Sequence, residues 1–131
     1  MADVEINEEK FLQELDRELR KVVDEIFTKS QLNIVNNGTV NEGFLLKSGD
    51  VVKVSDAHYK IVYSAPYAEV IEFGSEPHMP PVKPIERWVR LKLGITNEQE
   101  ARSIAWAIAK GIEKEGTRPQ PFLRPALDSV R

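Results

Sequence analysis

The sequence predicts an α+β fold in which one long helix comes first, a small antiparallel sheet follows, and further helices end the chain. Two observations predict it: apolar residues recur at helical spacing before residue 37, and two short segments rich in β-branched and aromatic residues follow. The 131 residues suit one domain, so we expect residues 1–131 to form a single unit. With 41% hydrophobic and 30% charged residues, disordered, collagen-like and membrane classes are excluded.

The first predicted helix runs from Glu8 to about Asn36. Asn7 is placed to cap it, Ile6 and Phe11 occupy the positions of a hydrophobic staple, and Gly38 offers a left-handed stop. Its apolar stripe needs a flat partner, which we expect to be the sheet that follows. The stripe consists of Phe11, Leu12, Leu15, Leu19, Val22, Val23, Ile26 and Phe27.

Two strands are predicted at residues 51–54 and 59–63, with residues 55–58 as the turn between them. Residues 44–46 (FLL) are too short to assign and fit either a strand or a helical turn. A short helix is expected over residues 67–73, ending at Gly74.

Residues 74–83 contain three prolines, which remove backbone donors and favour extended geometry. This segment is expected to be a semi-rigid loop, and two interpretations remain open. It is either an arm that docks on a partner or a packed connection within the chain.

Two more helices are predicted to form a helical hairpin. Pro84 suits the first helical position of one, which stops at Gly94. Thr96 and Gln99 have capping-box spacing for the other, whose apolar stripe runs from Ala101 to Ile112.

Two further features lie in the last third of the chain. Trp106 falls about 200° around the helix from Ile104, so either another part of the chain covers it or it is available to a partner. After the hairpin helices, residues 122–127 (FLRPAL) are expected to form a final helical turn or two.

The charges sum to −3, but they are distributed unevenly: residues 1–26 carry −5 and residues 83–131 carry +4. General nucleic-acid binding is disfavoured by this balance. Either the two ends are solvated faces, or the acidic end of one subunit meets the basic end of another. Because no segment resembles a secretory signal or a membrane span, we expect a protein made and used, or assembled, inside a cell.

No motif predicts catalysis or a resident cofactor. The chain has no cysteine, no nucleophile motif and no phosphate-binding glycine loop. Glu69 and Glu72 are spaced for one helix face, and we interpret them as solvated or interface carboxylates. His58 and His78 lack metal-ligand spacing and are interpreted as structural. We therefore expect no catalytic residue, no metal and no cofactor.

Three segments in order resemble the minor structural protein family of tailed phages, the tail-completion or head-to-tail joining proteins. They are residues 67–75 (YAEVIEFGS), 79–89 (MPPVKPIERWV) and 116–127 (GTRPQPFLRPAL). Ser75 stands where threonine is commoner in that family. The resemblance implies a long helix on a small antiparallel sheet, and a non-enzymatic virion protein of the phage neck.

The resemblance also implies partners and a location. Such a protein is expected to form a ring, a hexamer, which joins the DNA-filled head to the tail through the head connector or stopper and the tail tube or tail terminator. DNA only passes through the channel, no membrane is involved, and the protein is assembled in the host cytoplasm into the virion. The residues expected to contact partners are Tyr67, Glu72, Phe73, His78, Met79, Pro80, Pro81, Trp88, Trp106, Pro121, Phe122 and Arg124.

Three alternatives are kept. One is a tail terminator ring, and another is a host peptide-binding adaptor that uses the proline-rich loop. The third is a small hydrolase or nuclease that uses His58, His78, Glu69 and Glu72.

Overall fold

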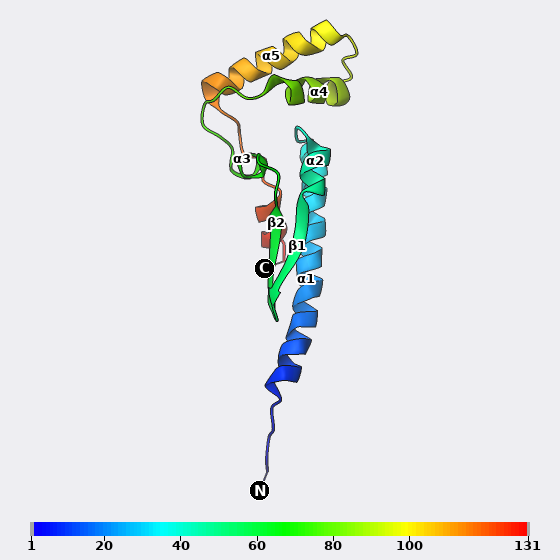
Figure 1. Cartoon of the computed structure of the whole chain (residues 1–131), viewed down its shortest axis with the longest axis vertical. Helices are drawn as coiled ribbons and strands as arrows, with labels where there is room; N and C mark the ends of the chain where they lie inside the picture. Colours follow the sequence, from blue (N-terminus) through cyan, green and yellow to red (C-terminus); the bar gives the residue numbers. More distant parts are fainter. Residues whose placement is uncertain (1, 131) are drawn as a thin grey trace.

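A long helix forms the axis of the molecule in the computed structural model, which describes residues 2–130 (Figure 1). Helix α1 (Glu8–Asn37) begins where the Asn7 side-chain oxygen accepts the N–H of Lys10 at 3.2 Å. It ends at Gly38, whose φ of 60° is left-handed and whose N–H bonds to the Val35 carbonyl. Both predicted ends are thereby confirmed, and the 30 residues span about 45 Å.

A two-stranded antiparallel hairpin lies along α1. Strands β1 (Gly49–Ser55) and β2 (His58–Tyr63) pair with Val51 opposite Ile61, and the register shifts between Lys53 and Ser55 near the tip. The unassigned residues 44–46 lie in helix α2 (Glu42–Lys47), which joins α1 to β1. The predicted α+β class, with its long first helix and small sheet, is therefore what the structure has.

The first hydrophobic core lies where the C-terminal half of α1 meets the hairpin, α3 (Ala68–Phe73) and α6 (Leu123–Asp128). Tyr63 stacks on Phe27 and meets Phe122 edge to face, with ring centroids 6.1 and 4.9 Å away. The expected final helical turn is α6, which packs beside α1. The buried members of this core are Ile34, Leu45, Ala65, Ala68 and Phe122.

The second core belongs to the helical hairpin of α4 (Val82–Leu93) and α5 (Glu98–Glu115), which crosses the end of α1 (Figure 1). Alanines 101, 105 and 109 of α5 are fully buried, and their small size lets the two helices approach closely. Its buried members are Ile85, Val89, Ala101, Ala105 and Ala109.

Two predicted helix-start signals are wrong, and α3 and α6 each begin one residue later than the expected segments. Helix α4 begins at Val82, so Pro84 is its third residue and not its first. The cap of α5 is Asn97, whose side-chain oxygen accepts the Glu100 N–H at 2.9 Å, so the Thr96 capping box does not form.

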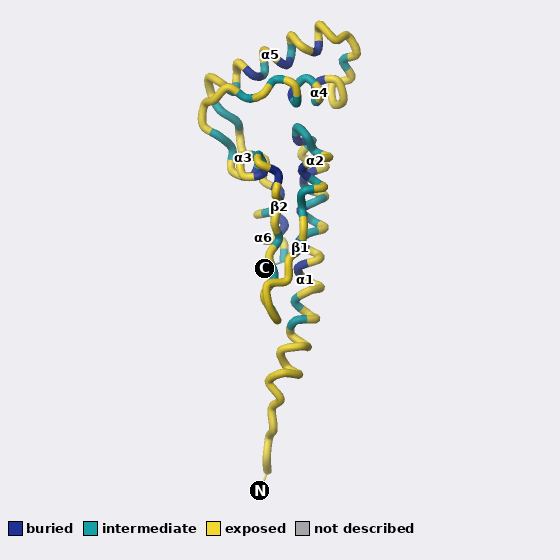
Figure 2. Tube along the Cα trace, in the orientation of Figure 1, coloured by how far each residue is buried: buried dark blue, intermediate teal, exposed yellow. Residues whose placement is uncertain are grey.

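The apolar stripe of α1 is only half covered, contrary to expectation. The strands are at most seven residues long, about 23 Å, so the hairpin reaches only as far as Asp16 along the helix. Beyond that point Phe11 and Leu15 are 60% and 44% exposed, and Ile6 is 74% exposed, so the predicted staple shields neither Ile6 nor Phe11. Figure 2 shows this exposed stretch between the hairpin tip and the N-terminus.

The helical hairpin is attached to the rest of the molecule by few polar contacts. The indole N–H of Trp88 donates to the Gly38 carbonyl at 2.7 Å, and Lys92 pairs with Glu42 at 3.0 Å. None of the helices in the described chain combines the length and apolar character that a membrane span requires.

Candidate functional site

The first and third motif segments are joined directly, although more than 40 residues separate them. Ser75 and Thr117 form an antiparallel bridge in which each N–H donates to the other's carbonyl at 3.1 Å. Their hydroxyl oxygens lie 2.8 Å apart. The two motifs are therefore parts of one local structure.

Glycines on either side of this bridge are required by the backbone. Gly74 and Gly116 have φ of 78° and 79°, which side chains disfavour. A Cβ added at Gly74 would lie 2.7 Å from the Thr117 carbonyl oxygen, and one at Gly116 would overlap the Ser75 carbonyl oxygen. The close approach of the two segments thus depends on both glycines.

Glu72 holds the beginning of α6. Its Oε2 accepts the N–H groups of Phe122 and Leu123 at 2.8 and 3.0 Å, and its Oε1 accepts that of Arg124 at 2.8 Å. These are donors that the first turn of a helix leaves without partners. Glu72 is only 8% exposed.

The expectation that Glu72 and Phe122 contact partners is therefore wrong. Glu72 is neither a solvated nor an interface carboxylate, because it is buried and both its oxygens accept backbone N–H groups of the same chain. Phe122 is 2% exposed and lies in the first core against Tyr63. Both residues support the fold, and neither presents a surface to another molecule.

All three motif segments also converge on the end of α1 and the loop after it. The Tyr67 hydroxyl donates to the Asn41 carbonyl at 3.1 Å, and Trp88 donates to Gly38. The Asn37 side chain donates to two carbonyls of the third motif, at residues 120 and 121, each at 3.2 Å. Tyr67 and Trp88 are half-buried, so each presents only part of its ring to solvent.

The remaining candidate residues are accessible but do not form one patch. Phe73, 71% exposed, and Arg124 line a cleft between α3 and α6. His78, Pro80 and Pro81 line a second cleft, beside α4. The exposed candidates are Phe73, His78, Met79, Pro81, Trp106, Pro121 and Arg124, and Pro80 is half-buried.

Trp106 is 46% exposed on α5, which agrees with the interpretation that its side chain is available to a partner. The proline-rich segment, in contrast, is a packed connection and not a free arm. It is held at the Ser75–Thr117 bridge and by the His78 N–H, which donates to the Ile112 carbonyl at 3.3 Å.

The residues proposed for a hydrolase or nuclease are not brought together. His58 begins β2 at the tip of the hairpin, whereas Glu69, Glu72 and His78 follow its other end (Figure 1). Within residues 2–130, no group of three or more His, Cys, Asp or Glu side chains is placed to hold a metal ion.

One serine lies near a histidine. Ser75 Oγ is 3.3 Å from His78 Nδ1, while that nitrogen is 2.9 Å from the Glu76 carbonyl oxygen. A carbonyl only accepts, so in the tautomer that bonds to Glu76 the Nδ1 atom carries the hydrogen and has no lone pair for the serine proton.

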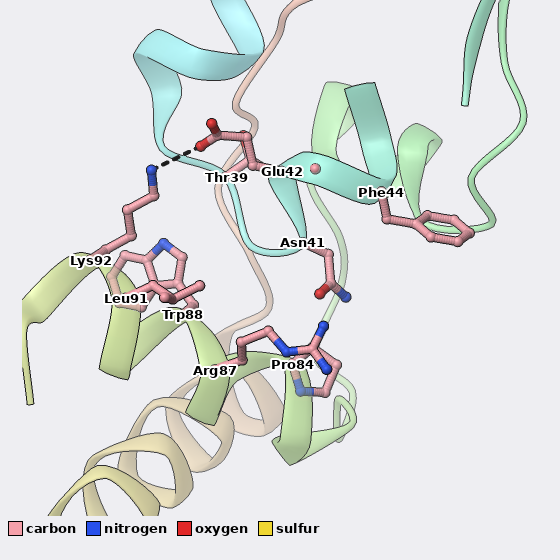
Figure 3. A pocket seen from close by; sticks show the side chains of 10 residues that line it. Thr39, Asn41, Glu42, Phe44, Pro84, Arg87, Trp88, Leu91 and Lys92 are labelled. Carbon is pink, nitrogen blue, oxygen red and sulfur yellow. Dashed lines mark ion pairs between the residues drawn. The ribbon is translucent and has the colours of Figure 1, made fainter. Parts of the chain in front are cut away.

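Sequence reasoning missed a cleft between α2 and α4, of about 380 Å³. Figure 3 shows the Lys92–Glu42 ion pair at one side and Arg87 extending from α4 toward Asn41. Phe44 and Leu91, 59% and 74% exposed, contribute apolar surface. Its apolar residues come from helices far apart in the sequence, so no local pattern could have indicated it.

Sequence reasoning also missed that α1 extends past the hairpin. This could have been foreseen, because the predicted helix is about twice as long as the predicted strands.

Comparisons of the chain with protein-family models, with curated proteins and with solved structures find no match. What the chain does must therefore be argued from its own residues and their geometry.

Proposed function

We propose that this chain is a non-enzymatic structural subunit of the neck of a tailed phage, forming a hexameric ring that joins the filled head to the tail. Its partners are further copies of itself, the head connector or stopper, and the tail tube or tail terminator. The observation that carries an assembly role is the exposed apolar half of α1, and the three-motif resemblance specifies the kind of assembly.

The exposed part of α1 supports an assembly subunit because apolar residues that gather on an exposed surface mark interaction sites. Phe11, Leu12, Leu15 and Val22 of the same stripe are each at least 40% exposed. They lie in the segment that carries the net charge of −5. Apolar surface inside a charged rim is the composition typical of protein interfaces.

The convergence of the three motifs supports the resemblance. Residues of all three segments bond to one region, residues 37–41, and the first motif caps the helix of the third. A set of short motifs that builds one structural unit is more specific than the same motifs scattered over a surface.

A ring needs two different surfaces on each subunit, because every copy meets its two neighbours through unlike faces. The acidic N-terminal end and the basic C-terminal third offer such a pair by charge. In Figure 1 the N-terminus and the α4–α5 hairpin lie at opposite ends of the long axis, so the two surfaces are separate.

Disruption of the gene in its source phage or prophage tests this function. We expect electron micrographs of the lysate to show filled heads and tails of normal length that remain separate, and expression of the wild-type chain to restore joined particles. Overlong tails would instead indicate that the chain is a tail terminator and not a joining protein. Normal infectious particles would contradict both roles.

A further inference from the structure

We infer that the N-terminal arm of one copy, residues 2–15, binds in the α2–α4 cleft of a second copy. The inference rests on the proposed function only in taking the chain to be an assembly subunit. Here the α2–α4 cleft is the one lined by Thr39, Asn41, Glu42, Gly43, Phe44, Pro84, Arg87, Trp88, Leu91 and Lys92.

The N-terminal arm is acidic and apolar at once. It holds five acidic residues against one base, Lys10, for a net charge of −4. Val4 and Ile6 are 88% and 74% exposed, and Phe11 follows on the first turns of α1. Within residues 2–7 no helix or strand forms, so this end of the arm is free to adapt to a partner.

Acidic and apolar residues alternate at the tip of the arm, in the order Asp3, Val4, Glu5, Ile6. In extended backbone, alternate side chains point to opposite sides. Val4 and Ile6 then enter an apolar cleft together, while Asp3 and Glu5 remain at its rim.

The α2–α4 cleft has complementary features. Phe44 and Leu91 remain 59% and 74% exposed, although the Phe44 ring also contacts Tyr67 on one side. Arg87 lines the cleft and makes no ion pair within residues 2–130, so its guanidinium can receive a carboxylate. Thr39, 3% exposed, also lines it, and its hydroxyl has no hydrogen-bond partner in the described chain.

The neighbouring cleft beside the proline-rich connection is a poorer match. It too has an arginine without an ion pair among the described residues, Arg118. It exposes apolar surface as well, but of its valine, isoleucine and tyrosine residues only Val70 is exposed, at 37%. The α2–α4 cleft instead presents Phe44 and Leu91, 59% and 74% exposed, as protruding side chains for the arm to contact.

The arm must belong to another copy, because its own cleft is out of reach. The cleft begins at Thr39, just after the C-terminal end of α1, while the arm lies at the N-terminal end (Figure 1). The helix between them holds them about 45 Å apart. Two copies therefore meet with the arm of one at the cleft of the other.

Cross-linking tests this contact directly, since the chain has no native cysteine. A Val4→Cys chain is mixed with a Leu91→Cys chain and treated with a flexible bismaleimide. We expect a cross-linked heterodimer in several-fold higher yield than with Val62→Cys, which is 39% exposed on the hairpin. Equal yields, or no cross-link in either mixture, would overturn the inference.

Charge reversal provides an independent test by sedimentation velocity over a concentration series. Arg87→Glu should weaken self-association at least about tenfold, and Asp3→Lys with Glu5→Lys should restore part of it. The matched control is Arg118→Glu, which should associate like the wild type. A wild-type chain that stays monomeric throughout, or equal weakening by both arginine variants, would contradict arm binding.

The outcomes separate this inference from the proposed function. If arm and cleft cross-link but the product is a closed antiparallel dimer, the arm contact stands and the ring is contradicted. If gene disruption separates heads from tails while no cross-link forms, the neck function stands and the arm contact is wrong.

Discussion

The Glu72 side chain accepts three backbone N–H groups where α6 begins, and it is nearly inaccessible to water. Hydrogen bonds to a charged acceptor are stronger than those between neutral groups, and buried donors left without partners are costly. This one side chain therefore fixes the third motif against the first.

Glu72→Gln should lower the free energy of unfolding by about 2 kcal/mol, since one carboxylate oxygen is replaced by a donor that faces a backbone N–H. Chemical denaturation measures the loss. Glu69→Gln, an exposed neighbour on the same helix, is the control and should change stability little. A Glu72→Gln protein as stable as the control would contradict the role given to this carboxylate.

Gly116 and Gly111 form a second matched pair. Gly116→Ala should destabilise the protein by roughly 1–3 kcal/mol or more, because its φ is 79° and the new methyl group would overlap the Ser75 carbonyl. Gly111→Ala, inside α5 with open space around it, should stabilise by about 0.5–1 kcal/mol. Thermal unfolding of both variants checks the opposite signs.

At the scale of elements, the tip of the hairpin is fastened to α1 by Asp16. The Ala57 N–H, the Tyr59 hydroxyl and Lys53 donate to its carboxylate at 2.8, 2.9 and 3.2 Å. The bond from Ala57, which contributes most, and those from the other two hold the pKa of Asp16 below its ordinary value of 3.8. The bond to Asp16 likewise raises the pKa of Lys53.

A lowered carboxyl pKa stabilises the fold fully above the unfolded value, near 3.8, and this contribution disappears as the pH falls through the lower folded value. We therefore expect Asp16→Asn to be less stable than the wild type at neutral pH and to approach it as the pH falls below 3.8 and through the lowered folded value. Denaturation midpoints over an acid pH series test this. A constant difference down to the lowest pH would contradict it.

Trp88 connects the α4–α5 hairpin to the end of α1 through its bond to Gly38. Trp88→Phe removes the indole N–H and leaves the Gly38 carbonyl without that donor. The free energy of unfolding should fall by about 1 kcal/mol. The α4–α5 hairpin should then show faster hydrogen exchange near residues 82–93, while the first core remains protected. Equal loss of protection in both cores would indicate that they unfold together.

Much of the architecture follows from local sequence patterns. Helical spacing and the Asn7 and Gly38 signals located α1, and β-branched segments located the hairpin. The start of α5 was placed one residue early because Thr96 and Asn97 are both suitable caps, and the backbone conformation decides between them.

The candidate site was less predictable because it depends on contacts between distant residues. Burial of Glu72 follows from α6 packing against it, 50 residues later in the chain. Spacing alone placed this carboxylate on a helix face and could not reveal what covers it. Phe122 was misassigned for the same reason, as an aromatic residue suits an interface and a core equally well.

At the scale of the whole molecule, two small cores lie along a long helix whose part before Asp16 has almost no cover (Figures 1 and 2). A helix gains most of its stability from packing of its apolar face, so this part, which the hairpin does not reach, should fray in an isolated subunit. Assembly with other subunits would supply the missing packing. This accounts for an apolar stripe that the chain itself does not bury.

Hydrogen exchange of residues 8–15 tests this most directly, by comparison of the dilute subunit with the particle that contains it. Slow exchange in the particle and fast exchange in the dilute subunit are predicted, with residues 23–37 protected in both states because they adjoin the first core. Identical exchange of residues 8–15 in the two states would show that the stripe meets no partner and would contradict the assembly role.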